Sequence, residues 1–390
     1  MVPNLLKPSQ LGEIPKDWNR IKLSDVMKVR QGLQIAISER LTSPTSTSKE
    51  YITIQSIKKT DQVREYVEAP SQRVICSKDD VLMTRTGNTG IVVTGVEGAF
   101  HNNFFLMDFD KNRIDTTFLV NYLRSPRIQH LILTKAGAST IPDLNHKDFY
   151  SIEFPLAPIL EQQKIAKILS TWDKAISTTE RLIDNSTQQK KALMQQLLTG
   201  KKRLLDDEGK RFEGEWKFSN FEVLFKVAND KKTQIKSSDY LEEGSVPIID
   251  QGKKLVSGYT NNSEVYSDIP VIVFGDHTRI IKWIDFEFAQ GADGTQVLKN
   301  MEGLHAKFAY YLLLNTDVPN LGYSRHMREL KEKDFKYPLE KAEQQKIATV
   351  LTNADKEIKL LEQQLADLQQ EKKALMQVLL TGKKRVKLTD

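Results

Sequence analysis

Three short polar turns hold the residues of this sequence that are best suited to reading nucleic-acid bases. They are TRTGNTG from Thr84, GDHTR from Gly275 and GADGTQ from Gly291. An arginine can donate two hydrogen bonds to guanine, a carboxamide can pair with adenine, and glycine lets a backbone approach phosphate closely. Each turn lies between apolar segments that are typical of strands, so each is also consistent with an ordinary connecting turn.

The candidate DNA-binding residues come from these turns and from one polar position near the start of each half. They are Gln31, Arg85, Thr86, Gly87, Asn88, Thr89, Lys231, Asp276, His277, Thr278, Arg279, Asp293, Gly294, Thr295 and Gln296. Arg85 has the reach for a base edge or a phosphate. Arg279 is the favoured base reader because Asp276 could orient its guanidinium; alternatively, the two side chains pair only to hold the turn.

No motif for catalysis is found in the sequence. It lacks a Walker phosphate loop, a GxGxxG segment, a CxxC pair and an HExxH segment, and His277 alone makes no metal site. Triplets of the form E-x-K, at Glu208 and Glu357, are expected by chance in a chain with 28% charged residues. We therefore predict no catalytic residue, no metal site and no cofactor in this chain.

The composition indicates a multidomain globular protein. A chain of 390 residues with 39% apolar residues is expected to form more than one domain. The one cysteine, Cys76, excludes an internal disulfide and fits a reducing compartment, and no apolar run reaches the length of a membrane span. We expect a cytoplasmic location. The net charge of +6 does not by itself establish DNA binding, since residues 205–342 are net acidic.

Two helical segments repeat each other. Residues 161–204 and 343–386 are identical at 25 of 44 positions, from EQQKIA to LLTGKKR. Apolar residues recur in steps of four and three along both, which predicts a coiled-coil seam on helices of about 40 residues, or roughly 60 Å. The predicted seam and partner-binding residues are Ile165, Leu169, Trp172, Ile176, Leu193, Leu197, Ile347, Leu351, Ile358, Leu361, Leu365, Leu375 and Leu379.

Several features of the repeat leave alternatives open. Lys190 and Lys372 interrupt the seam and indicate either a wet section or a register-setting contact. Gly200 and Gly382 are placed to end the helices, and the KKR that follows suits a helix C-terminus or, less favourably, a phosphate. The helices could pair antiparallel within one chain, with a pseudo-twofold axis, or between two chains.

Strands and short helices fill the two dissimilar blocks that precede these repeats. Strand-like segments cover 51–57, 79–96, 104–109, 246–252, 269–275 and 283–298, and helices are predicted at 116–125 and 304–315. Both blocks begin at a tryptophan and end with KDF and a Pro-Leu step before the repeated helix. We predict an α+β fold for each block.

This arrangement resembles the specificity subunits of type I restriction-modification enzymes. The resemblance covers essentially the whole chain and rests on the framed blocks, the EQQKIA and LLTGKK segments, DDVLMTRTGNTG, and the segment from Ile269 to Leu298. It implies two globular α/β target-recognition domains, 1–155 and 205–340, separated by conserved helical spacers, 156–204 and 341–390, that form an antiparallel coiled coil.

The resemblance also implies partners. A family member of this kind recognises an asymmetric bipartite target in double-stranded DNA and binds two methyltransferase subunits, which restriction subunits then join. S-adenosylmethionine, ATP and magnesium would belong to those partners, and no membrane contact is expected. The rival interpretations are a single-chain DNA-modifying enzyme and a coiled-coil scaffold that does not bind DNA.

Overall fold

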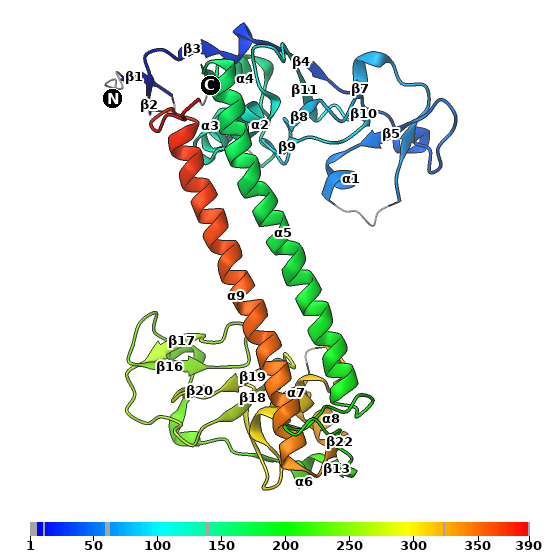
Figure 1. Cartoon of the computed structure of the whole chain (residues 1–390), viewed down its shortest axis with the longest axis vertical. Coiled ribbons are helices and arrows are strands. Elements are labelled where there is room, and N and C mark those ends of the chain that lie inside the picture. Colours follow the sequence, from blue (N-terminus) through cyan, green and yellow to red (C-terminus); the bar gives the residue numbers. More distant parts are fainter. Residues whose placement is uncertain (1–5, 11, 59–62, 138–139, 323, 389–390) are drawn as a thin grey trace. The chain divides into compact units, whose positions relative to one another are not determined.

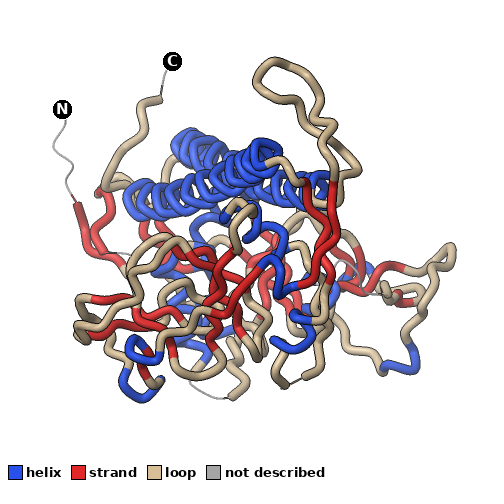
Figure 2. The backbone as a smooth tube through the Cα atoms, turned by 90° about the horizontal axis from the view of Figure 1, so that it is seen from below, coloured by secondary structure: helices blue, strands red, loops and turns tan. Residues whose placement is uncertain are grey.

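The computed structural model of the chain describes residues 6–10, 12–58, 63–137, 140–322 and 324–388 (Figure 1). The chain divides into two compact units: Met1–Thr179 with Gln364–Asp390, and Glu180–Gln363. Two long helices, α5 (Ile159–Leu197) and α9 (Lys341–Leu379), each contribute one part to each unit. Apart from these helices, most of the described chain consists of strands and connecting loops (Figure 2).

In its described residues, the first unit contains two four-stranded sheets and two strand pairs. One sheet has the order β4-β11-β8-β9, and the other has the order β6-β5-β10-β7. The strands of these sheets are β4 (Met27–Gln31), β5 (Lys49–Ile52), β6 (Tyr66–Val67), β7 (Ile75–Cys76), β8 (Val81–Thr84), β9 (Val92–Val93), β10 (Gly98–Phe100) and β11 (Phe104–Phe109). The pairs are β1 (Leu6–Ser9) with β2 (Gly12–Pro15), and β3 (Asn19–Lys22) with β12 (Glu153–Leu156).

The described residues of the first unit also form the short α-helices α1 (Ile54–Lys58), α2 (Thr116–Arg124), α3 (Pro126–Ala136) and α4 (His146–Tyr150). Short 3-10 turns cover Leu23–Asp25, Ile37–Glu39 and Gln72–Val74. The main core joins Trp18 and Phe118 of the block to Ile165 at the start of α5 and Leu379 at the end of α9. Both long helices are therefore part of the hydrophobic core of this unit.

The second unit repeats this plan with different residues. Its sheets have the orders β14-β21-β18-β19 and β15-β20-β16-β17, and β13 pairs with β22. The strands are β13 (Trp216–Asn220), β14 (Phe225–Val227), β15 (Gln234–Ile235), β16 (Val246–Ile249), β17 (Gly258–Thr260), β18 (Val271–Gly275), β19 (Ile281–Ile284), β20 (Ala289–Gly291), β21 (Thr295–Asn300) and β22 (Asp334–Pro338). The helices are α6 (Phe221–Leu224), α7 (Ala306–Leu314) and α8 (Met327–Lys331), with 3-10 turns at Lys231–Thr233 and Ser237–Asp239.

Within each unit, α5 and α9 run antiparallel. In the first unit Lys372 pairs with Asp173 at 2.5 Å, and in the second Lys190 pairs with Asp355. All the predicted seam positions are buried or half-buried. The two lysines that interrupt the seam are thus neutralised by an aspartate of the other helix.

Each helix end is fastened to the start of the other helix by an arginine. Gly200 and Gly382 follow the two helices and adopt the left-handed backbone conformation, with φ of +73° and +66°, that ends each helix. Arg385 then donates to both oxygens of Glu161 at 2.7 and 2.8 Å, and Arg203 donates to both oxygens of Glu343 at 2.5 and 2.7 Å. We call these two ion pairs, Glu161–Arg385 and Glu343–Arg203, the helix clasps.

A buried glutamine follows each clasp glutamate and forms hydrogen bonds with the block that precedes it in the sequence. Gln162 accepts from the Asp115 N–H and donates to the carbonyls of Arg113 and Ala157. Gln344 makes the matching set of bonds with the N–H of His305 and the carbonyls of Gly303 and Pro338. The glutamate and the first glutamine of each EQQ segment are therefore structural, as are the arginines of KKR, while the second glutamine of EQQ and the lysines of KKR are exposed.

Most of the predicted elements agree with the structure. The strand at 104–109, the helices at 116–125 and 304–315, and both long helices are confirmed. The prediction for 51–57 is wrong beyond Ile52, because the chain enters α1 at Ile54. The KDF segments near the ends of the two blocks are not structurally equivalent, because Phe149 of the first lies in α4 whereas Phe335 of the second lies in β22.

Candidate nucleic-acid interface

Matching strand registers show which loops correspond in the two units. Phe105 pairs with Gln31 across β11 and β4. Asn229 lies two positions beyond the last β14–β21 pair, Val227 with Leu298, and is opposite Gln296. Phe104 pairs with Thr84 as Thr295 pairs with Gly275, so the turns after β8 and β18 are equivalent. β10 pairs parallel with β5 as β20 does with β16, so the loops after β4, β5, β8 and β10 have counterparts after β14, β16, β18 and β20.

The turn that follows β8 holds residues 85–89 in a fixed shape. Gly87 and Gly90 have φ of +80° and +91°, in the left-handed region that favours glycine. The Thr84 hydroxyl donates to the Asn88 carbonyl, and the Gly90 N–H donates to the Thr84 carbonyl at 2.8 Å. The Asn88 side chain remains exposed at the tip of the turn.

Arg85, Thr86 and Thr89 fasten this turn to the segment before α4. Nη2 of Arg85 donates to both oxygens of Asp143 at 2.9 Å, and the Thr86 hydroxyl donates to Asp143 at 2.5 Å. The Thr89 hydroxyl donates to the Pro142 carbonyl at 2.7 Å. The Arg85 side chain is only 16% exposed. In this structure its guanidinium is paired with Asp143 and holds the turn in place.

A cavity of about 600 Å³ opens beside this turn. Its polar wall is formed by Arg40, Gln55, Asn88, His101 and Asn103, and no aspartate or glutamate is among the described residues that line it. Carboxamides can read base edges, and a wall without carboxylates does not repel phosphate. We call this hollow the polar cavity. Gln31 is not among the described residues that line it, and its Nε2 donates to the Asn102 carbonyl at 3.2 Å.

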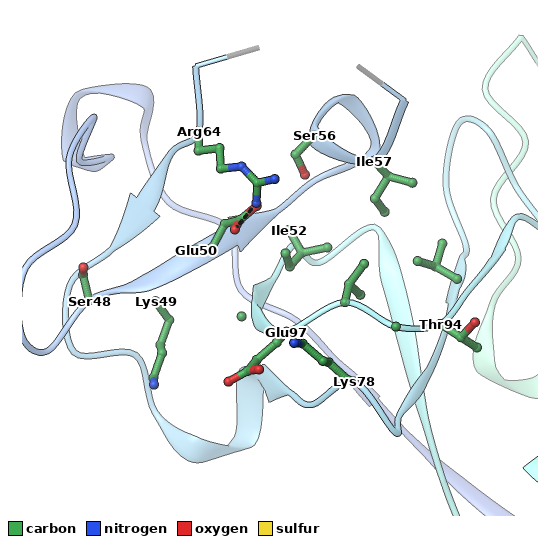
Figure 3. Close-up of a pocket in the computed structure, with 14 residues that line it drawn as sticks. Ser48, Lys49, Glu50, Ile52, Ser56, Ile57, Arg64, Lys78, Thr94 and Glu97 are labelled. Atoms are coloured by element: carbon green, nitrogen blue, oxygen red, sulfur yellow. Dashed lines mark hydrogen bonds and ion pairs between the residues drawn. The ribbon is translucent and has the colours of Figure 1, made fainter. Parts of the chain in front are cut away.

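A second cavity of the first unit has the same volume and a different character (Figure 3). Lys49, Arg64 and Lys78 line it together with two acidic residues, Glu50 and Glu97. The Arg64 guanidinium already pairs with Glu50 at 2.5 Å. Because carboxylates repel phosphate, the polar cavity is the better candidate for the DNA-facing surface.

His101 is held as a neutral donor in the polar cavity. Its Nδ1 accepts from the Asn103 N–H at 3.0 Å, which leaves the ring proton on Nε2. Burial, and to a smaller degree the charge of Arg40, lowers the pKa of His101. Arg40 itself donates to Glu65 at 2.8 Å, and its Nε is buried without a partner among the described residues.

In the second unit the turns GDHTR and GADGTQ lie against each other. The Asp276 N–H donates to the Gly294 carbonyl at 2.7 Å, and a Cβ at Gly294 would come within 2.7 Å of the His277 ring. Gln251, which follows β16, joins them: its Oε1 accepts from the His277 N–H at 3.1 Å, and its carbonyl accepts from the Thr278 hydroxyl at 2.6 Å. Both predicted turns thus meet in one place.

Asp276 and Arg279 do not pair with each other. Asp276 is 3% exposed and accepts from the Met327 N–H at 2.7 Å, which fastens its turn to α8. Arg279, with φ of +61°, donates to the Val318 carbonyl at 2.9 Å. Asp276 therefore has a role like that of Arg85, and the predicted link between Asp276 and Arg279 is wrong in both of its forms.

The remaining candidates differ in exposure. Asn229 Nδ2 donates to Gln296 Oε1 at 2.8 Å, which places an amide pair at the edge of β21. Lys231 and Asp293 are exposed, whereas Thr295 is buried within β21 and cannot face DNA with its side chain.

The sequence predictions missed several polar residues of these surfaces: Arg40, Gln55, His101, Asn229 and Gln251. Four of them lie within three residues after a strand: His101 after β10, Asn229 after β14, Gln251 after β16, and Gln55, already in α1, after β5. Such a position was the signal that could have found them. In the described part of the chain, no three His, Cys, Asp or Glu residues are grouped to hold a metal, and no helix has the length and apolar character to span a membrane.

Comparison with known proteins places these surfaces in context. Residues 15–185 and 213–370 match the family model described as a type I restriction modification DNA specificity domain. The putative type I restriction enzyme MjaX specificity subunit of Methanocaldococcus jannaschii is 27% identical, over 98% of this chain and 97% of that relative. The MjaVIII specificity subunit of the same organism is 24% identical, over 96% and 94% of the two chains.

Two solved structures share the fold. The S subunit of the type I restriction-modification system from M. genitalium has a TM-score of 0.60 at 16% identity, covering 100% of this chain and 99% of that one. A chain from a study of complex assembly and conformational transition in the type I system has a TM-score of 0.54 at 14% identity, covering 95% and 99%.

Proposed function

Because the chain belongs to the type I restriction-modification DNA specificity family, we propose that it reads an asymmetric DNA target in two parts. The polar cavity of the first unit reads one half, and the surface around Gln251, His277 and Gln296 reads the other. The observation that carries this proposal is the same set of four loops built twice with unlike polar residues. Equal scaffolds with different side chains suit two different half-sequences.

The chain also binds two methyltransferase subunits, through residues that the two long helices share. The glutamate and first glutamine of EQQ and the arginine of KKR are explained by internal contacts, but other identities lie at exposed positions with no such explanation. The exposed identical pairs include Lys174 and Lys356, Glu180 and Glu362, Gln188 and Gln370, Lys191 and Lys373, and Gln195 and Gln377. Equal exposed side chains at equal helix positions suit one partner that binds twice.

Charge reversal on the helices tests this docking surface. Lys191→Glu and Lys373→Glu should each lose one methyltransferase copy, and the double variant should lose both, as measured by light scattering of the purified complex. Lys359→Glu is the matched control, because Lys359 is also exposed but is aligned with a different residue, Ser177, in the other repeat. An intact complex of the double variant with two methyltransferase copies would refute this assignment.

Catalysis belongs to the partners in this proposal. The chain itself neither cuts nor methylates DNA, S-adenosylmethionine, ATP and magnesium act on the methyltransferase and restriction subunits, and the complex works in the cytoplasm. The purified chain, incubated with DNA and all three cofactors, should leave the DNA unmodified. Cleavage or methylation that survives removal of contaminating subunits would favour the single-chain enzyme instead.

An exchange of the second block tests the bipartite reading. Replacing residues 205–340 with the equivalent block of another family member should change one half of the methylated sequence and leave the other half intact. The readout is the methylated motif, obtained by single-molecule sequencing of DNA from cells that carry the complex. A change in both halves would contradict the division of labour between the units.

A further inference from the structure

We infer that Gln251 reads one adenine of the second half-site and that Lys282 is the positioning residue that holds its loop. This inference rests on the proposed function and adds a specificity-determining residue to it. Both residues belong to the second unit. The loop after β16 that carries Gln251 was absent from the candidates predicted by sequence.

The carboxamide of Gln251 has a defined orientation. Its Oε1 accepts from the His277 N–H at 3.1 Å, and because a backbone N–H can only donate, the oxygen must face that group. A Cβ at Gly294 would lie 2.7 Å from both Nε2 and Oε1, so the amide packs flat against this glycine. Nε2 has no hydrogen-bond partner within the described part of the chain, and Gln251 is half-buried.

An amide held in this way matches the edge of adenine. Nε2 can donate to N7 of the base, and the second lone pair of Oε1 can accept from the N6 amino group. The His277 N–H prevents the amide from rotating by half a turn, which would present the opposite pattern of donor and acceptor. The site is thus set for one base before DNA binds, which limits the loss of side-chain entropy on binding.

Lys282 fixes the loop on which Gln251 lies. Its side chain is 5% exposed, and Nζ donates to the carbonyls of Asp250 at 2.7 Å and Lys254 at 2.6 Å. The Asp250 carboxylate lies 3.7 Å from the same nitrogen. Burial lowers the pKa of Lys282, and Asp250 opposes that shift. The two carbonyls bracket Gln251, so the ammonium closes the loop around it.

The fold itself does not require a lysine at this position. Lys282 pairs with Val273 across β19 and β18, and the equivalent pair in the first unit is Val93 with Leu82. A buried lysine must be desolvated, whereas a valine in the same sheet position is not. We therefore assign Lys282 to the geometry of the loop rather than to the stability of the sheet.

The test uses the full chain assembled with its methyltransferase subunits and DNA duplexes changed at one base pair at a time. Gln251→Ala should reduce discrimination at one adenine of the second half-site by about 5- to 150-fold, the range expected for one bidentate contact. Gln251→Glu should shift the preference at that position toward cytosine, because a carboxylate accepts from the N4 amino group. Loss of folding alone cannot produce a new preference.

Lys282→Met tests the positioning role. It keeps the length of the side chain and removes the ammonium, so discrimination should fall across the second half-site while the first half-site is read as before. A lysine that only stabilised the sheet would lower methylation of all duplexes by one common factor. Gln55→Ala is the matched control, because it removes an amide from the first unit and should change the first half-site alone.

Two outcomes would overturn the inference. One is full discrimination at every position of the second half-site by Gln251→Ala and Gln251→Glu, both at the wild-type rate. The other is an unchanged pattern of discrimination in Lys282→Met. A wild-type complex without any sequence-dependent methylation would instead refute the proposed function, so the two failures are distinguishable.

Discussion

Removal of the arginine from each helix clasp should destabilise the two units to different extents. Arg203→Ala leaves Glu343, which is 0% exposed, without either of the hydrogen bonds that Arg203 donates. Arg385→Ala leaves Glu161 with one remaining bond, from Trp18 Nε1 at 3.1 Å. The Trp216 Nε1 atom at the matching place is buried without a partner among the described residues.

The magnitudes follow from these partners. A buried carboxylate that loses its whole ion pair costs about 3 to 5 kcal/mol, which we expect for Arg203→Ala. The Arg385 side chain is 33% exposed, and water screens its pair more strongly. With the Trp18 bond also retained, we expect about 1 to 3 kcal/mol for Arg385→Ala.

Urea unfolding followed by tryptophan fluorescence measures both effects. Arg203→Lys and Arg385→Lys are the matched controls: they keep the charge but lose the two-pronged geometry of the guanidinium, so each should lie between wild type and the alanine variant. The reasoning is refuted if Arg385→Ala is the more destabilising of the two, or if neither lowers the free energy of unfolding by more than about 1 kcal/mol.

Three further predictions concern the first unit and the link between the blocks. Gly209 and Gly382 both have a positive φ, so alanine strains the backbone at either position. Gly209→Ala meets no atom within 4 Å and should cost about 1 to 2 kcal/mol in thermal unfolding. Gly382→Ala would also place a methyl group 2.5 Å from Pro15 and should cost clearly more. Burial raises the pKa of Cys76 to about 11, so at pH 8 iodoacetamide should label the thiol only after unfolding, as read by mass spectrometry. Arg85→Ala should weaken binding of the assembled complex to DNA with any first half-site to the same extent. Loss of discrimination at only one base pair would instead show that Arg85 reads a base.

The long helices could be predicted from sequence because their signals are local and repeated. A seam in steps of four and three, glycine stops and identical ends define α5 and α9 to within a few residues. The clasps could not be predicted, since Glu161 and Arg385 are 224 positions apart and nothing in either segment names its partner.

The candidate surfaces were predictable only in part for the same reason. Polar turns after strands could be recognised, and Asn88 and His277 do lie on such turns, whereas Gln296 lies in β21. Whether an arginine is available depends on residues far along the chain, and Arg85 meets Asp143 across 58 positions. The prediction that the two KDF segments are equivalent was wrong because a three-residue identity does not determine whether the segment lies in a helix or in a strand.

The two buried glutamines, Gln162 and Gln344, have a consequence for how this chain can change over time. Every hydrogen bond that they make to the blocks ends on a main-chain N–H or carbonyl. The amide therefore recognises the path of the backbone and is indifferent to the side chains attached to it. A block can exchange nearly all of its surface residues without any compensating change in the helix that holds it, so one half of the molecule can acquire a new preference while the other half is left undisturbed.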